Sequence, residues 1–312
     1  MKRILFVIMA LFTLICVGCS NNNGATTTEV DNYKLSVLAP GGAPAIAAAE
    51  LATTYKDDYT FTLGVEASVL QTEFVNKTND VIIAPINLGA NMYSKNQNYV
   101  LASVLTWGNL FFASGKANFT LADMNGADVI FFGQNTVNDV VVKYVLEQNN
   151  IVPANITYLG DTGLTRDQLV ASDDVIVLIA EPALSVAKAK KANITSISVQ
   201  DLYQEASGNN KFPQAGCFVK QDTIKEHKAV VDSFLERLET SAGLCATQTE
   251  VVAGYAEAFA LGGTKPILTK AIPNCNINYV KASNAKAAIE FAVSIKPALF
   301  GGAVPANEFY YA

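Results

Sequence analysis

The sequence has a single histidine, His227, among its 312 residues. Most hydrolases and metalloenzymes use histidine for proton transfer or metal ligation, so their usual residue constellations are excluded. Charge is also sparse: 16% of residues are charged, with 28 acidic against 22 basic ones and no block of basic residues. An acidic chain without a basic patch repels phosphate backbones, which excludes general nucleic-acid binding.

Glycine and proline are few as well, at 20 and 10 residues, while half of the chain is apolar. This composition excludes a fibrous, low-complexity or disordered chain. At ~100–200 residues per domain, the length predicts two compact units.

An apolar run at residues 4–17 is shorter than the ~20 residues that span a bilayer. It follows Lys2 and Arg3, the arrangement of a secretory signal. Its end, Cys16-Val17-Gly18-Cys19, resembles a bacterial lipobox, with Cys16 where that motif usually has leucine. The resemblance implies a signal peptide over residues 1–18 and a lipoprotein acylated at Cys19, with palmitate among the acyl groups. Residues 19–32 contain Asn, Gly and Thr with almost nothing apolar and predict a flexible tether. An ordinary signal peptide with an incidental cysteine is the alternative.

Three further cysteines, Cys217, Cys245 and Cys275, follow no zinc-binding spacing. Three thiols cannot all pair within the chain. Two interpretations stay open, a disulfide between Cys245 and Cys275 or buried free thiols.

From residue 34 the chain alternates strand and helix patterns. Residues 35–39, 61–65 and 81–84 predict strands, with helices at 44–55 and 69–75 between them. The same order recurs with strands at 129–132, 156–159 and 175–180 and helices around 137–145 and 164–169. Helical stripes at 231–238, 252–259 and 289–295 follow. Such alternation predicts parallel sheets with helices on both faces, arranged as two similar α/β lobes.

The segments 39–42, 85–87, 132–136 and 180–182 follow predicted strands. Ligands of open parallel sheets bind outside the carboxyl ends of the strands, where glycine permits close approach and helix starts offer free N–H groups. Ordinary βα turns use the same residue types. On spacing alone, ligand loops and structural turns are therefore equally supported.

A set of segments in fixed order carries a resemblance to a known family. They are Pro40-Gly41-Gly42-Ala43-Pro44, residues 83–90, Thr106-Trp107-Gly108-Asn109, residues 132–136, Ala180-Glu181-Pro182, Pro213-Gln214-Ala215-Gly216, residues 271–276 and residues 305–311. The chain resembles the nitrate/sulfonate/taurine-type, SsuA-like substrate-binding lipoproteins of ABC importers, from about Lys34 to its end. This implies a periplasmic-binding-protein type II fold, with two α/β lobes and a ligand cleft between them. The expected hinge crossovers lie near residues 112–117 and 212–219, which gives lobe 1 residues 33–115 and 217–312 and lobe 2 residues 116–216.

The resemblance also implies a function. The protein would capture a small molecule between its lobes and deliver it to the permease and ATPase subunits of an ABC transporter. It would act as a monomer, without catalysis, cofactor or metal, anchored by lipid in the cell envelope outside the cytoplasm. Two alternatives stay open: an enzyme on the same fold, of the pyrimidine- or menaquinone-pathway type, and a surface sensor without a permease.

The resemblance places the ligand at the loops between the lobes. The expected ligand-binding residues are Gly41, Gly42, Ala43, Asn87, Trp107, Asn109, Gln134, Asn135, Thr136, Glu181 and Gln214. One carboxylate beside an aromatic ring favours a neutral or cationic planar ligand, such as a heterocyclic amine of the thiamine-pyrimidine kind. A nitrate- or sulfonate-type oxyanion held by backbone amides is the alternative. Structural interpretations also stay open, with Trp107 as core filling and Glu181 as a helix cap.

Overall fold

The computed structural model of the chain describes residues 32–208 and 210–311. The predicted signal peptide, Cys19 and almost all of the predicted tether lie outside these residues. Across the described ranges, no helix has both the length and the apolar character needed to cross a membrane.

The first lobe is built on a six-stranded sheet in the order β11-β4-β10-β3-β1-β2. Strands β1, β2 and β3 run parallel, while β10 runs antiparallel to both β3 and β4. The strands are β1 (Leu35–Pro40), β2 (Tyr59–Val65), β3 (Val81–Pro85), β4 (Tyr99–Trp107), β10 (Pro213–Lys220) and β11 (Ile277–Lys281).

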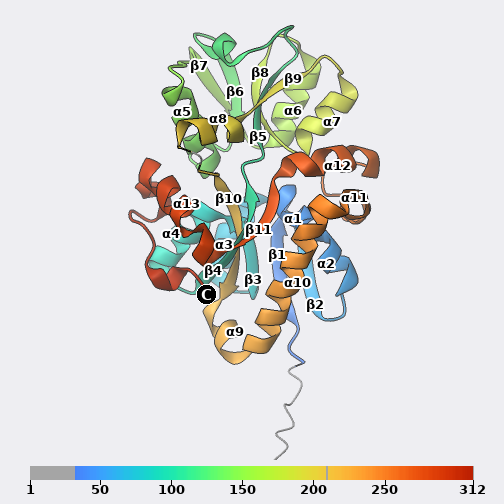
Figure 1. Ribbon diagram of the computed structural model, residues 1–312, viewed down its shortest axis with the longest axis vertical. Helices are drawn as coiled ribbons and strands as arrows, with labels where there is room; N and C mark the ends of the chain where they lie inside the picture. The colour runs from blue at the N-terminus through green and yellow to red at the C-terminus, as the bar shows by residue number, and fades with distance from the viewer. Residues whose placement is uncertain (1–31, 209, 312) are drawn as a thin grey trace, which may run out of the picture. The chain divides into compact units, whose positions relative to one another are not determined.

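The second lobe is built on a five-stranded sheet in the order β7-β6-β8-β5-β9, seen above the first sheet in Figure 1. Strand β6 runs parallel to β7 and β8, while β5 runs antiparallel to β8 and β9. The strands are β5 (Leu110–Ser114), β6 (Asp128–Phe132), β7 (Asn155–Leu159), β8 (Ile176–Ala180) and β9 (Thr195–Ser198).

These sheets confirm the predicted α/β class and the two lobes. The predicted parallel pairing holds for β1 with β2 and β3 and for β6 with β7 and β8, but each sheet also contains antiparallel strands. Both sheets are mixed because β5 and β10 each enter their sheet from the other lobe. A strand that arrives from the hinge runs opposite to strands that end there.

The predicted lobe boundaries need correction for the same reason. The chain leaves the first sheet after Trp107 and joins the second at Leu110, so all of β5 belongs to the second lobe. It returns between Ser198 and Pro213, so all of β10 belongs to the first lobe. The boundaries predicted after residues 115 and 216 therefore fall beyond the end of β5 and within β10.

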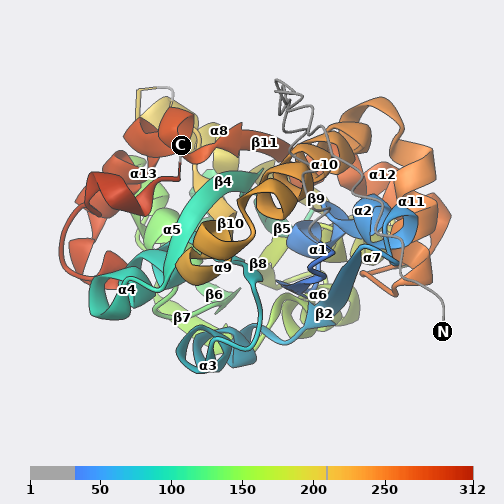
Figure 2. The same ribbon diagram turned by 90° about the horizontal axis from the view of Figure 1, so that it is seen from below.

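Helices cover both faces of each sheet. On the first sheet, one core joins β1 residues such as Val37 to α10 (Lys228–Thr247), and the other joins Leu38 and Ile82 to α3 (Leu70–Asn76), α4 (Ile86–Asn96) and α13 (Ala282–Ile295). Figure 2 shows α10 and α3 on opposite sides of this lobe. The helices are α1 (Ala43–Ile46), α2 (Ala49–Thr54), α3 (Leu70–Asn76), α4 (Ile86–Asn96), α5 (Val137–Gln148), α6 (Thr162–Ala171), α7 (Ala183–Lys190), α8 (Val199–Ala206), α9 (Gln221–Glu226), α10 (Lys228–Thr247), α11 (Thr249–Ala258), α12 (Lys265–Ala271) and α13 (Ala282–Ile295). Short 3-10 turns are η1 (Ala67–Val69), η2 (Leu121–Met124), η3 (Ile272–Cys275), η4 (Pro297–Phe300) and η5 (Asn307–Phe309).

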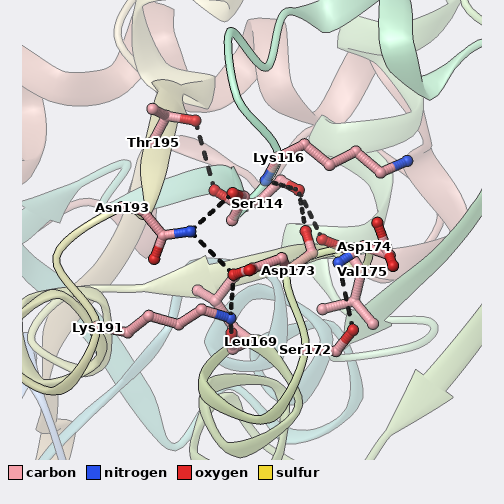
Figure 3. A network of polar contacts seen from close by, with 11 residues as sticks. Ser114, Lys116, Leu169, Ser172, Asp173, Asp174, Val175, Lys191, Asn193 and Thr195 are labelled. Atoms are coloured by element: carbon pink, nitrogen blue, oxygen red, sulfur yellow. Dashed lines mark hydrogen bonds and ion pairs between the residues drawn. The ribbon is translucent and has the colours of Figure 1, made fainter.

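A polar network closes the end of the second sheet that lies away from the hinge (Figure 3). The Ser114 hydroxyl, at the end of β5, donates to the Val175 carbonyl at 2.8 Å. Lys191 and Asn193 both contact Asp173 Oδ1, at 2.6 and 2.9 Å, and their hydrogen bonds lower the pKa of Asp173. The network joins the start of β8 to the segment before β9, which fixes the outer end of this lobe.

Candidate functional site

The short crossover between β4 and β5 brings three of the predicted site residues together. The Asn109 amide Nδ2 donates to the Glu181 carbonyl at 3.0 Å, and the Asn109 backbone N–H donates to Gln214 Oε1 at 3.1 Å. Gln214 Nε2 in turn donates to Asn138 Oδ1 at 3.2 Å. Both crossovers and the end of β8 are thus held as one polar junction at the hinge.

Asn109 is only 4% exposed, and its Oδ1 has no hydrogen-bond partner among the described residues. The bond from Nδ2 to the Glu181 carbonyl fixes the orientation of the amide, because a carbonyl oxygen can only accept. Buried polar atoms are almost always paired. Asn109 Oδ1 is therefore a buried acceptor to which the described residues supply no donor.

Glu181 is buried, and its carboxylate is already engaged. The Ser185 backbone N–H and hydroxyl donate to the two carboxylate oxygens at 3.0 and 2.9 Å, so Glu181 caps the start of α7. Burial raises the pKa of Glu181, against the lowering effect of the Ser185 bonds. The Glu181 carboxylate thus acts as a helix cap in this structure. In the sequence, the feature that indicates this role is Ser185, four residues after Glu181.

The predicted residues of the first lobe lie at the ends of β1 and β3. Gly42 has φ +82° and precedes α1, while Ala43 is buried. The Gly41 N–H is occupied by the Val65 carbonyl at 3.2 Å. Asn87, in the first turn of α4, has a buried Oδ1 with no partner in the described part of the chain. Of these residues, Asn87 offers a free acceptor.

The predicted loop of the second lobe, between β6 and α5, is shaped by local bonds. Gly133 and Asn135 both have positive φ, and the Thr136 hydroxyl donates to the Gly133 carbonyl at 2.6 Å. The Asn135 N–H donates to Asp139 Oδ2 at 3.2 Å. The Thr136 hydroxyl is thus used inside the loop, while Gln134 and Asn135 are exposed.

Trp107 lies at the junction of the lobes, 6% exposed, in a core that continues from the first sheet into the second. Its indole N–H donates to the Asn278 carbonyl at 2.8 Å. A cavity of about 370 Å³ lies beside this side chain, and none of the other predicted site residues lines it. Most of the Trp107 side chain is therefore packed in the core, as the core-filling interpretation expects.

The lobes also touch at a point that no sequence motif marks. Pro182, at the start of α7, lies against Gly262 and Gly42 of the first lobe. A Cβ at Gly262 would come within 2.5 Å of Pro182 Cγ. Gly262 also has φ +109°, which favours glycine. The adjacent glycines at 262 and 263 predict only the end of a helix, although Gly262 also forms this contact.

The three described cysteines and the single histidine lie in buried or stacked surroundings. Cys217, Cys245 and Cys275 are free and buried, and burial raises the pKa of all three thiols, that of Cys245 to about 12. His227 stacks on Tyr33, with ring centroids 3.8 Å apart. The described ranges also contain no group of three or more His, Cys, Asp or Glu residues placed to hold a metal ion.

Comparison with known proteins gives a match in structure. No protein-family model matches the chain, and no curated protein sequence matches it. An ABC transporter from Parabacteroides distasonis is similar in structure with a TM-score of 0.76 and 19% identity, covering 89% of this chain and 99% of that one. The periplasmic aliphatic sulphonate binding protein SsuA from Escherichia coli gives 0.68 and 14%, covering 89% and 92%. The ligand-binding component of an ABC-type import system from Staphylococcus aureus, with zinc bound, gives 0.67 and 13%, covering 89% and 95%.

At these identities the likeness is one of fold. The chain has the two-lobed α/β fold of the type II periplasmic binding proteins, as predicted, and its structural neighbours include SsuA-type proteins. In this fold the junction of Asn109, Glu181 and Gln214 lies where the two lobes meet.

Proposed function

We propose that this protein is the solute-binding component of an ABC importer, which captures a small molecule between its lobes and delivers it to a permease. The proposal includes export, a lipid anchor at Cys19 and a monomer working outside the cytoplasm. The fold supports it, and so do the structural neighbours that are named as import-system binding proteins. The observation that carries it is the junction at the hinge, where Asn109 keeps a buried acceptor free.

The side chains expected to line the ligand cleft, Asn87 and Asn109 in particular, favour a ligand that donates hydrogen bonds. Asn87 and Asn109 each hold a buried oxygen without a donor, and no lysine or arginine is among the predicted site residues. An oxyanion would bring further acceptors to these oxygens, whereas ring N–H and amino groups would satisfy them. We infer a neutral or cationic heterocyclic amine as the ligand.

The first experiment is to purify the protein in native form, denature it, and identify any released small molecule by mass spectrometry. A stoichiometric heterocyclic amine would support both the binding function and the ligand class. An oxyanion would support the binding function and contradict the ligand class. If saturating panels of amines, oxyanions and sulfonates neither co-purify nor shift the melting temperature, the binding proposal fails.

Replacing Asn87 separates a binding role from a structural one. Asn87→Leu removes an acceptor that has no partner in the protein, so the stability of the ligand-free protein is expected to stay within ~1 kcal/mol of wild type. Affinity for the identified ligand is expected to fall about tenfold, the effect of ~1.4 kcal/mol. Titration calorimetry measures the affinity and thermal unfolding the stability. Asn91→Leu, one turn further along α4, is the matched control and should bind normally. Equal binding by both variants would remove Asn87 from the site.

A further inference from the structure

The cavity beside the hinge, with a volume of about 370 Å³, has walls from both lobes. Gln200 of α8 and Lys211 come from the second lobe and the returning crossover. Ile272 and Ile277 come from η3 and β11 of the first lobe, and Trp107 lies at the crossover between them. Asn87, Asn109 and Glu181 do not line it. Of the expected ligand-binding residues, Trp107 alone lines the cavity, which is therefore distinct from the site around Asn87, Asn109 and Glu181.

Gln200 is one of the residues that line this cavity, and its side-chain amide carries a buried donor without a partner among the described residues. It is only 6% exposed, and its Oε1 accepts from the Phe212 backbone N–H at 3.2 Å. This bond fixes the orientation of the amide, and the buried Nε2 has no partner among the described residues. A Cβ at Gly108 would come within 2.1 Å of Gln200 Oε1, so glycine at the crossover is required for this packing. The Gln200 side chain is thus fixed by its hydrogen bond and its packing, and its Nε2 lacks an acceptor.

The other residues that line the cavity restrict the kind of ligand whose acceptor could bond to Gln200 Nε2. Lys211 is exposed and forms no ion pair within the described ranges, so its ammonium is available at the same cavity. Ile272, Ile277 and the ring of Trp107 supply apolar surface, since the indole N–H is already bonded. Asp201 of α8 also lines the cavity and repels a negatively charged ligand, about twice as strongly for a dianion as for a monoanion, so one negative charge is the most that Lys211 can balance here.

We propose that the hinge cavity is a second small-molecule site, which binds a monocarboxylate with an apolar body. The carboxylate accepts from Gln200 Nε2 and Lys211 Nζ, and the apolar body lies against Trp107 and Ile277. Because the walls come from both lobes, an occupant biases how the lobes are placed, and ligands of the cleft and of the hinge cavity affect each other's affinity equally. The second site stands on its own residues, and only its coupling to a cleft ligand rests on the proposed function.

Trp107 is the single tryptophan of the chain, so its fluorescence reports on this cavity directly. Phenylacetate is the probe, and phenylacetamide, which has the same ring without the charge, is the comparison. We expect phenylacetate to change the emission saturably and to raise the melting temperature, with phenylacetamide binding at least ~10-fold more weakly. The absence of any saturable change up to about 10 mM phenylacetate, or equal binding of the amide, would overturn the proposal.

Two variants locate the binding. Gln200→Glu keeps an acceptor for the Phe212 N–H and replaces the amide donor by a carboxylate oxygen, so phenylacetate binding should fall at least ~10-fold. Lys211→Met changes an exposed side chain, which protects folding, and should weaken binding in the same direction. Lys190→Met, an exposed lysine on α7 that does not line the cavity, is the control. Binding that is unchanged in both Gln200→Glu and Lys211→Met would show that phenylacetate binds elsewhere and would reject the site.

Discussion

Asp80→Ala is expected to lower the free energy of unfolding by about 3–5 kcal/mol, the loss typical when one partner of a buried charged group is removed. Asp80 is 3% exposed, just before β3, and joins three segments of the first lobe. Its Oδ2 accepts from the Ser36 N–H and hydroxyl at 2.9 and 2.7 Å. Its Oδ1 accepts from Thr223 and Tyr33 at 2.7 and 3.0 Å and lies 3.2 Å from Lys220 Nζ. Truncation leaves all of these donors without their acceptor.

The same carboxylate gives stability a defined dependence on pH. Burial acts to raise the pKa of Asp80, but the hydrogen bonds from Ser36, Thr223 and Tyr33 outweigh it and hold the pKa below its usual value. The folded pKa is thus lower than the unfolded one, so the contribution is present above the unfolded pKa, ~3.9, and is lost as pH falls through the folded value. The wild-type protein should therefore lose stability in acid more steeply than Asp80→Ala.

Urea unfolding at pH 7 and at about pH 3 measures both effects. Asp57→Ala is the control, because Asp57 is an exposed turn residue, and its unfolding free energy should stay within ~0.5 kcal/mol of wild type. Asp80→Ala with wild-type stability at pH 7, or with the same acid dependence as wild type, would show that this network does not hold the lobe together.

Much of the fold follows from local sequence patterns. Strands β1, β3 and β8 are apolar runs bounded by turns, and the helical stripe containing Phe234 and Leu238 is buried as its period predicts. Strand β4 is different, because Ser103 and Thr106 interrupt its apolar run although all nine of its residues are buried. Strands β5 and β10 take their direction from the lobe they come from, which a local pattern does not contain.

The candidate site also has features that a local sequence pattern predicts and features that depend on distant contacts. Polar loops at strand ends are local features, so Asn87 and Asn109 can be proposed from the sequence. Which hydrogen bonds each side chain forms, however, depends on partners that are distant in the sequence. The core packing of Trp107 and the unpaired amide of Gln200 arise only when distant segments meet. The contact between Pro182 and Gly262 likewise joins residues from different lobes.

Gly262→Ala is expected to weaken binding of the cleft ligand roughly 30-fold. The new Cβ would come within 2.5 Å of Pro182 Cγ, whereas nonbonded carbon atoms pack at ~3.5–4.0 Å. The lobes must separate at this point, and overpacking of this kind costs about 1–3 kcal/mol. A ligand held between the lobes binds in proportion to the fraction of molecules that reach the closed arrangement, so ~2 kcal/mol appears as a loss of about 30-fold in apparent affinity. Titration calorimetry measures the affinity, and small-angle X-ray scattering should show a larger radius of gyration with ligand present.

Gly302→Ala is the matched control for this prediction. Gly302 has φ +97°, close to the +109° of Gly262, so alanine suffers a similar backbone strain at both positions. A Cβ at Gly302, however, would meet no atom within 4 Å. Any loss of stability shared by the two variants is therefore backbone strain, and any loss of affinity confined to Gly262→Ala reports the contact between the lobes. Equal affinities in the two variants would mean that the ligand binds without requiring Pro182 to lie against Gly262, and closure at this point would then have no role in capture.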